Sequence, residues 1–263
     1  MFWIGYIIIG AVAGVLAGLL GVGGGLVIVP ALTFILAAQH LPPDHIMQLA
    51  LGTSLATIMF TSISSLRSHH EHGAVNWLVV RAITPGILTG TFLGAWVAAQ
   101  LPTRFLKGFF VFFIYYVAVQ MLLNIKPKPT RTLPGKAGMF GVGNIIGVVS
   151  SLVGIGGGSL SVPFMAWCNI PVHHAIGTSA AIGFPIALAG TAGYITSGLV
   201  VHDLPSGSLG FIYLPALLGI AVISILTAPL GARLAHRLPV SMLKKIFAFF
   251  LIGIGTKMLT GLF

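Results

Sequence analysis

The chain has 263 residues and a mean hydropathy of +1.06, and only 6% of its residues are charged, whereas soluble domains carry about 25%. A surface this apolar excludes a soluble globular enzyme and predicts a protein that spans a lipid bilayer. The formal charge of +10 would suggest nucleic acid in a soluble protein, but the cations lie in short segments between apolar runs, so no nucleic-acid partner is expected.

The apolar runs predict ten membrane segments, five on each side of a basic linker. The first begins without a basic region ahead of it, so it is predicted to be a membrane helix rather than a cleaved signal peptide. The segments of the first half are 2–20, 26–39, 45–65, 77–100 and 104–124. Residues 125–136 are rich in Pro, Lys and Arg and cannot enter lipid. The segments of the second half are 137–154, 159–170, 174–196, 209–236 and 240–262.

The two halves carry the same motifs in the same order, which indicates an internal duplication. The run G-L-L-G-V-G-G-G-L-V-I-V-P at 18–30 returns as S-L-V-G-I-G-G-G-S-L-S-V-P at 151–163, an offset of 133. A-L-G-T-S at 50–54 returns as A-I-G-T-S at 175–179, an offset of 125. We therefore expect a first transmembrane repeat, 1–124, and a second, 137–263, joined by the linker 125–136.

The distribution of Lys and Arg chooses the topology. With ten crossings, one side of the membrane holds Arg67, Arg81, Lys126, Lys128, Arg131, Lys136, Arg233, Arg237, Lys244 and Lys245, and the other holds only Arg104, Lys107 and Lys257. With eight crossings the split becomes seven to six and carries no signal. The positive-inside rule therefore favours ten segments, inverted repeats and a cytoplasmic linker. Whether the short segments 26–39 and 159–170 span or re-enter stays open.

The two Gly-rich runs are the candidate substrate site. Each glycine costs about 1 kcal/mol relative to Ala in a helix interior, so the runs should break helices, and broken backbone survives in lipid only where it lines protein or a wet cavity. The freed N–H groups would attract an anion. The spacing does not match a nucleotide-binding loop. The predicted site residues are Gly23, Gly24, Gly25, Gly156, Gly157 and Gly158; the alternative is close helix packing through small residues.

The duplicated G-T-S motifs add hydroxyl groups at matching places in the two halves. Thr53, Ser54, Thr178 and Ser179 lie about 9–13 Å into their helices, where they would donate to a solute or bond back to the helix backbone. All three acidic residues fall in predicted loops. With no intramembrane carboxylate to hold a cation, an anionic substrate is favoured.

Histidines are the candidate metal ligands. His69, His70 and His72 surround Glu71, and His173 precedes His174. We interpret both groups as interfacial loops and predict no metal site and no cofactor. Cys168 is the only cysteine, so no intramolecular disulfide can form.

The duplicated G-x-G-G-G-x-x-x-x-P runs, each followed by G-T-S, resemble the sulfite exporter TauE/SafE family of membrane permeases over essentially the whole chain. The resemblance implies transport of sulfite, sulfoacetate or other organosulfonates across a bacterial-type cytoplasmic (inner) membrane, driven by ion gradients rather than ATP. By position it points to the G-T-S residues and to the motif residues Gly21, Gly23, Gly24, Gly25, Pro30, Gly154, Gly156, Gly157, Gly158 and Pro163.

The sequence thus predicts an all-α polytopic membrane protein, a helical bundle of two inverted repeats broken at Gly-rich turns. It would be a secondary transporter rather than an enzyme, with a small sulfur-containing anion held near the midplane and one half rocking against the other. Its partners would be that anion, the lipid bilayer and a coupling ion. The alternatives are a divalent metal or other cation permease using the loop histidines, and a membrane enzyme or sensor without transport. The particular anion, the direction of flux and the oligomeric state stay open.

Overall fold

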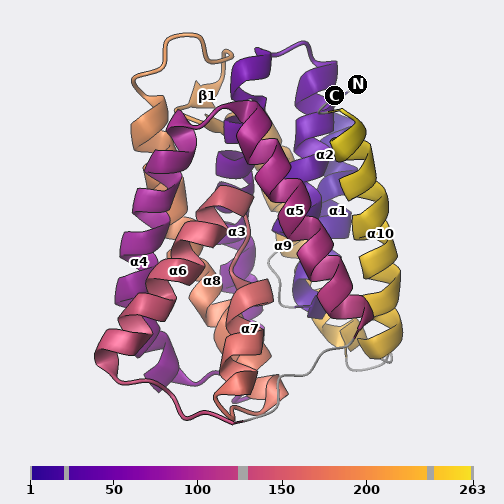
Figure 1. The fold of residues 1–263 in the computed structure, drawn as a ribbon. Helices are drawn as coiled ribbons and strands as arrows, with labels where there is room; N and C mark the ends of the chain where they lie inside the picture. The colour runs from indigo at the N-terminus through magenta and orange to yellow at the C-terminus, as the bar shows by residue number, and fades with distance from the viewer. Residues whose placement is uncertain (1, 21–23, 124–129, 236–239, 262–263) are drawn as a thin grey trace.

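The computed structural model describes residues 2–20, 24–123, 130–235 and 240–261, which form helices joined by loops, with one short β-hairpin (Figure 1). The elements of the first half are α1 (Phe2–Leu20), α2 (Gly25–Ala38), the 3-10 helix η1 (Pro43–His45), α3 (Ile46–Glu71), α4 (Trp77–Gln100) and α5 (Thr103–Leu122). Those of the second half are α6 (Lys136–Val153), α7 (Gly158–Trp167), α8 (Val172–Gly198), β1 (Ser208–Leu209), β2 (Ile212–Tyr213), α9 (Leu214–Ala235) and α10 (Val240–Thr260).

Six of the described helices are long and apolar enough to cross a membrane. They are α3 together with η1, α4, α5, α6, α8 and the 214–231 part of α9. By contrast, α2 has 14 residues and α7 has 10. At 1.5 Å per residue these two helices are about 21 and 15 Å long, short of the roughly 30 Å hydrocarbon core.

The two hairpins that contain the short helices, α1–α2 and α6–α7, enter the bundle from opposite ends (Figure 1). Both chain termini lie at one end, and α1 descends from there while α2 returns to it (Figure 1). From the other end, where α5 finishes and α6 begins, α6 rises and α7 turns back. The connection between α6 and α7 lies near mid-height (Figure 1). The chain thus folds back inside the bundle in each half.

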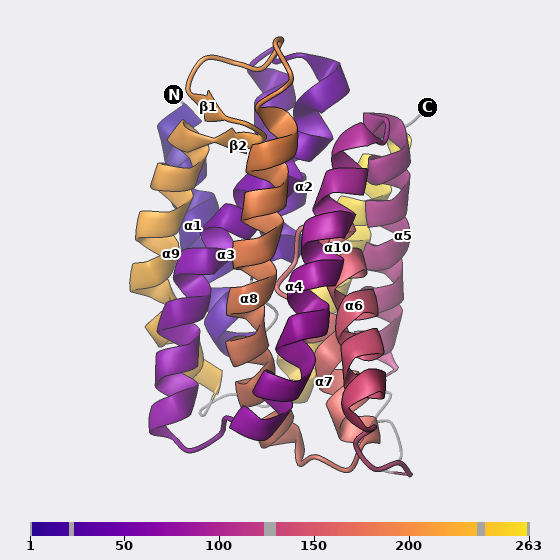
Figure 2. The ribbon, with the colours of Figure 1, turned by 90° about the vertical axis from the view of Figure 1, so that its left-hand side faces the viewer.

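The centre of the bundle is formed by α3 and α8, which pack on each other. Their most apolar 18-residue windows are 83% and 72% buried, against 33–50% for the other four candidate spans. Figure 2 shows α1 and α9 on one side of α8, and α4 and α6 on the other. An apolar helix buried on all sides is a core helix, whereas the half-exposed outer helices suit contact with lipid.

Glycines allow very close packing between helices of different halves. α1 packs on α9, and α4 packs on α6. A Cβ atom at Gly10 would lie 2.7 Å from the Ile220 carbonyl oxygen, and one at Gly143 would lie 2.5 Å from that of Ile83. Both distances are below the range that real Cβ atoms show, so only glycine lets the backbones approach this far.

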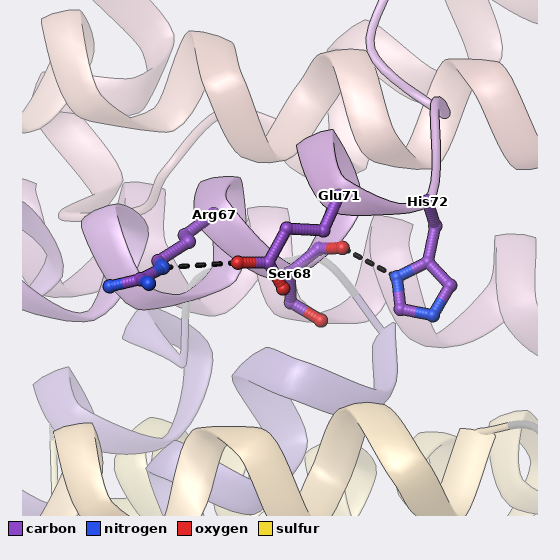
Figure 3. A network of polar contacts seen from close by, with 4 residues as sticks. All are labelled: Arg67, Ser68, Glu71 and His72. Carbon is purple, nitrogen blue, oxygen red and sulfur yellow. Dashed lines mark hydrogen bonds and ion pairs between the residues drawn. The ribbon is translucent and has the colours of Figure 1, made fainter.

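The structure extends α3 six residues beyond its predicted end, so the expected loop position of His69 and His70 is wrong: both lie in the last helical turn. Arg67 Nε and Glu71 Oε1, one turn apart, are 3.1 Å apart, and His72 Nδ1 lies 2.7 Å from the Ser68 carbonyl oxygen (Figure 3). Such an exposed i,i+4 pair contributes about 0.3–0.5 kcal/mol. These local contacts continue the helix beyond its apolar stretch.

Residues 209–213 were predicted to be helical, and that prediction is wrong. Ser208 pairs with Tyr213 and Leu209 with Ile212 in a two-stranded antiparallel ladder. Gly207 and Gly210 have φ values of 84° and 55°, which an α-helix does not allow. α9 therefore begins only at Leu214.

Candidate substrate site at the glycine-rich breaks

The two short helices begin in the same way. Gly24 precedes α2 with φ 72°, and Gly157 precedes α7 with φ 75°. In this left-handed region a residue with a Cβ atom costs about 1–2 kcal/mol, so glycine is required at both places. Gly154 ends α6 with φ 69°. Gly21 and Gly23, which were predicted from the motif, lie outside the described residues.

The start of α2 lies against the break between α6 and α7. A Cβ atom at Gly25 would lie 3.0 Å from Ile155 Cα and 3.1 Å from the Gly154 carbonyl carbon. Ser54 Oγ donates a hydrogen bond of 2.8 Å to the Gly154 carbonyl oxygen. The structure therefore brings together Gly25, Ser54 and the second Gly-rich run, which are far apart in the chain.

Among the described residues, the first turn of α7 presents N–H groups without a helical acceptor beside hydroxyl groups without a hydrogen-bond partner. The first bonds of this helix are donated by the N–H groups of Leu160 and Ser161, both to the Gly157 carbonyl oxygen at 3.1 and 2.9 Å. The N–H groups of Gly157, Gly158 and Ser159 precede them and have no acceptor within the helix. Within the described ranges, Ser150 Oγ and Ser159 Oγ are buried with no hydrogen-bond partner. Ser150 Oγ would lie 3.4 Å from a Cβ atom at Gly157.

A small cavity opens beside this break, between α3 and α8. Its polar lining comes from Thr61, Ser62 and Ser65 of α3, from Ser179 of α8, and from Gly156. It offers about 20 Å³ to the centre of a water-sized sphere, and one water needs roughly 10–15 Å³ by this measure. In this conformation the cavity accommodates a water molecule, and a sulfur oxyanion would need it to widen.

The Gly and Thr of each G-T-S motif contact a loop of the other half. Thr53 Oγ1 accepts a hydrogen bond from the N–H of Tyr213, and Thr178 Oγ1 accepts one from the N–H of Asn76, both at 2.9 Å. The preceding glycines match as well: Cβ atoms at Gly52 and Gly177 would each lie 2.5 Å from a loop carbonyl oxygen, that of Phe211 and that of Ala74. Each Gly-Thr pair thus holds the segment that precedes α9 or α4.

The serines of the two motifs differ from the threonines and from each other. Ser54 donates to the break at Gly154, whereas Ser179 Oγ accepts a 2.9 Å hydrogen bond from Ser161 Oγ of α7. Both serines are buried. Of the predicted site residues, the serines and the described glycines therefore lie around the breaks, while Thr53 and Thr178 lie at the loop contacts.

Sequence reasoning missed several hydroxyl residues at this place. Thr61, Ser62 and Ser65 line the cavity, and Ser150 and Ser159 flank Gly157. The available signal on α3 was the recurrence of Thr57, Thr61 and Ser65 every fourth residue, which places them on one stripe of the helix. Ser150 and Ser159 had no counterpart in the first half to mark them.

The histidines make local contacts at the end of the bundle. Trp77 Nε1 donates to His70 Nδ1 at 3.3 Å, and the rings of His173 and His174 have centroids 4.2 Å apart. In the part of the chain that the structure describes, no three His, Cys, Asp or Glu side chains are grouped so that they could hold a metal ion.

Comparison with known proteins agrees with the motifs. Residues 6–258 match the family described as Sulfite exporter TauE/SafE. A "Probable membrane transporter protein" of Haemophilus influenzae is 42% identical over 254 residues, 96% of either chain. The "Probable membrane transporter protein YunE" of Bacillus subtilis is 30% identical over 214 residues, 74% of this chain and 78% of its own. The "Probable membrane transporter protein MJ0441" of Methanocaldococcus jannaschii is 29% identical over 236 residues, covering 88% and 86%.

No solved structure matches the protein. The family match and the six apolar helices of spanning length support an integral, multi-pass membrane transporter. The chain belongs to the sulfite exporter TauE/SafE family.

Proposed function

We propose that this protein is a secondary transporter of small sulfur-containing anions, such as sulfite or organosulfonates, in the cytoplasmic membrane of a bacterium-like cell. The family description supports a sulfur substrate. The observation that carries the site is the meeting of the two breaks, where α7 begins with free N–H groups and two buried, unpartnered serine hydroxyls among the described residues.

The proposed site uses backbone dipoles rather than a charged side chain. A helix N-terminus carries roughly half a positive elementary charge, and its first N–H groups point along the helix axis. The N–H groups of Gly23 to Gly25 and of Gly156 to Gly158 would hold the anion, with Ser54 and Ser179 beside it. Thr53 and Thr178, which hold the loops in this conformation, would reach the anion only in another state of the transport cycle. The two threonines use an acceptor lone pair for the loops, so each hydroxyl proton stays available.

We also propose that residues 1–124 and 137–263 are inverted repeats with five segments each, in which α2 and α7 are half-helices. The matched contacts support this, because Thr53 and Thr178 are 125 positions apart and their loop partners Tyr213 and Asn76 are 137 apart. The offset of 137 also separates L-P-T-R-F-L-K at 101–107 from L-P-V-S-M-L-K at 238–244. The hairpins α1–α2 and α6–α7 enter from opposite ends (Figure 1), as inverted repeats require.

The linker 125–136 would lie in the cytoplasm. The α3–α4 connection and the ends of α5 and α6 that flank the linker lie at one end of the bundle (Figure 1). The cations Arg67, Arg81, Arg131 and Lys136 belong to these segments. With Lys126 and Lys128 of the linker, six cations on this side stand against three on the other, Arg104, Lys107 and Lys257, which supports the cytoplasmic side. An ion that moves down its gradient together with the anion, or in exchange for it, would supply the energy for transport.

Transport by the purified protein tests the function. Liposomes containing the protein should take up labelled sulfite or sulfonate under an imposed ion gradient. Gly24→Val and Gly157→Val should abolish flux, because Cβ atoms there would meet Ala13 and Ile186 and would strain a left-handed backbone. Gly141→Val on α6, where a Cβ atom meets open space, is the control for insertion. Flux of divalent metal instead of anion, or normal anion flux in both break variants, would overturn the proposal.

A further inference from the structure

We propose that the cavity between α3, α8 and the second break is the linker-side half of the anion site, with Ser179 as its side-chain donor and Thr61 and Ser62 as its opposite wall. This inference rests on the proposed function and deepens it. It assigns binding to α3 residues outside both duplicated motifs, and it gives the two motif serines different roles.

The direction of hydrogen bonding distinguishes the two serines. Ser54 uses its single proton to bond the Gly154 carbonyl oxygen. Ser179 instead accepts the proton of Ser161, so its own proton has no acceptor among the described residues. Ser179 also lines the cavity. A hydroxyl with one donor and two acceptor sites that is used only as an acceptor is ready to donate to a guest oxygen.

The α3 wall offers further donors that are weakly engaged. Thr61 Oγ1 lies 3.4 Å from the Thr57 carbonyl oxygen and 3.3 Å from that of Ile58, both long for an O–H···O bond. Ser62 Oγ donates to the Met59 carbonyl oxygen at 3.1 Å. These bonds lie within one helix, whose carbonyls already accept main-chain bonds. Turning such a hydroxyl toward an oxyanion exchanges a weak bond for a charge-assisted one.

Together these donors fit one chemical class of ligand. Hydroxyl donors lie on α3 and α8. The first turn of α7, whose leading N–H groups have no acceptor within the helix, follows directly from Gly156. A head group that accepts hydrogen bonds in several directions matches this arrangement. Sulfite and the sulfonate group each carry three oxygens that do so. We therefore assign the cavity, which has room only for a water molecule in this conformation, to an SO3-type head group in a state of the transport cycle in which α3 and α8 lie farther apart.

The absence of a side chain at Gly183 leaves space in the cavity, and filling that space provides the test. A Cβ atom at Gly183 would lie 3.5 Å from the Gly156 carbonyl oxygen and 3.7 Å from Ser62 Cβ, which are ordinary contact distances. Gly183 itself lines the cavity. Gly183→Ala should thus place a methyl group in the cavity without displacing the backbone, and replacing a helical glycine by Ala favours the helix.

The experiment measures binding of sulfite and methanesulfonate to the full chain in lipid nanodiscs by calorimetry, with Tm recorded for each variant. We expect Gly183→Ala to keep or raise Tm and to lose binding, while Gly141→Ala, which adds a methyl group in open space, binds normally. Ser179→Ala and Thr61→Val should each weaken binding by about tenfold, the effect of one charge-assisted hydrogen bond.

The possible failures are distinguishable. If the unsubstituted protein binds neither anion, the proposed function fails and the inference fails with it. If it binds them and Gly183→Ala binds equally well, the cavity is not the site, although the anion function stands. Unchanged binding in both Ser179→Ala and Thr61→Val would overturn the assignment of these two hydroxyl groups as donors. A lower Tm for Gly183→Ala would overturn the claim that the cavity has room for the added methyl group.

Discussion

Ser54 of α3 donates a 2.8 Å hydrogen bond to the carbonyl oxygen of Gly154, one hundred residues later in the chain. This bond joins the centre of the first half to the break of the second. It satisfies a carbonyl that the end of α6 leaves without a helical partner, because Gly154 is the C-cap residue. The conformation of the break thus depends on a side chain outside its own hairpin.

The Ser54 bond predicts a stability effect. Ser54→Ala should lower the free energy of unfolding by about 1–3 kcal/mol, because the buried Gly154 carbonyl loses its donor. Thermal unfolding in detergent measures this change. Thr196→Ala is the matched control, since the hydroxyl of the exposed Thr196 donates to the Ala192 and Gly193 carbonyl oxygens of its own helix. Equal Tm values for the two variants would contradict the structural role of Ser54.

The threonine contacts predict a matched pair of effects. Thr53→Val and Thr178→Val each remove the acceptor of one main-chain N–H and should each cost about 1–3 kcal/mol. Thr→Ser at either position keeps the acceptor and should restore most of the loss. Because the two contacts are separate, the double Val variant should show nearly additive effects in the same unfolding assay. If Thr→Ser does not restore the stability, the methyl group of the threonine rather than its hydroxyl group stabilises the contact.

Two glycines on α6 separate packing from helix propensity. Gly143→Ala should destabilise the protein, because its Cβ atom would lie 2.5 Å from the Ile83 carbonyl oxygen and force α4 away. Gly141→Ala, two residues earlier, should be neutral or stabilise by up to about 1 kcal/mol. Comparing the two Tm values tests the close approach of α4 and α6. A stabilising Gly143→Ala would refute it.

The end of the linker is attached to α7. The Arg131 N–H donates to the Trp167 carbonyl oxygen at 3.2 Å, Trp167 Nε1 donates to Thr130 Oγ1 at 3.0 Å, and the Arg131 guanidinium lies 5.3 Å from the Trp167 ring centroid. Trp167→Leu removes one hydrogen bond and the cation–π contact, so trypsin should cleave after Arg131 about tenfold faster. Mass spectrometry of timed digests measures the rate. Trp96→Leu on α4 is the control, and equal rates would contradict the attachment.

The proposed orientation predicts which loops label from which side. In a Cys168→Ala background, Pro134→Cys should react with an impermeant maleimide only from the cytoplasm. Ser206→Cys, in the loop at the opposite end of the bundle, should react only from outside (Figure 1). The reverse pattern in right-side-out vesicles would invert the topology.

Much of the helix pattern follows from the sequence. The apolar run predicted over 77–100 is α4, Trp77–Gln100, because an apolar stretch flanked by polar residues has its length set by lipid. Where polar residues continue a helix past the apolar stretch, as at His69 and His70, hydropathy places the end of the helix too early in the chain. At 209–213 the apolar residues form a hairpin, because the backbone conformation of Gly207 and Gly210 outweighs hydropathy.

The candidate site was only partly predictable. The duplicated glycines indicated where helices break, since their backbone requirement is local. The roles of Ser54 and Ser179 could not be told apart, because they depend on partners from other segments, Gly154 and Ser161. Thr61 and Ser62 were missed for the same reason, because hydroxyl groups on one helix indicate a binding site only when the opposite wall, here α8, is known.

The cross-half packing of α1 on α9 and of α4 on α6 limits how the molecule moves. Helices whose backbones touch through glycine cannot separate without opening voids, so we expect each pair to move as one unit. The moving parts of the transport cycle would then be two units, one containing α1 and α9 and the other α4 and α6. Each unit would combine helices of both halves, so the boundary between the moving units would differ from the boundary between the sequence repeats. Crosslinks within a unit should leave turnover intact, whereas a crosslink between the units would arrest it.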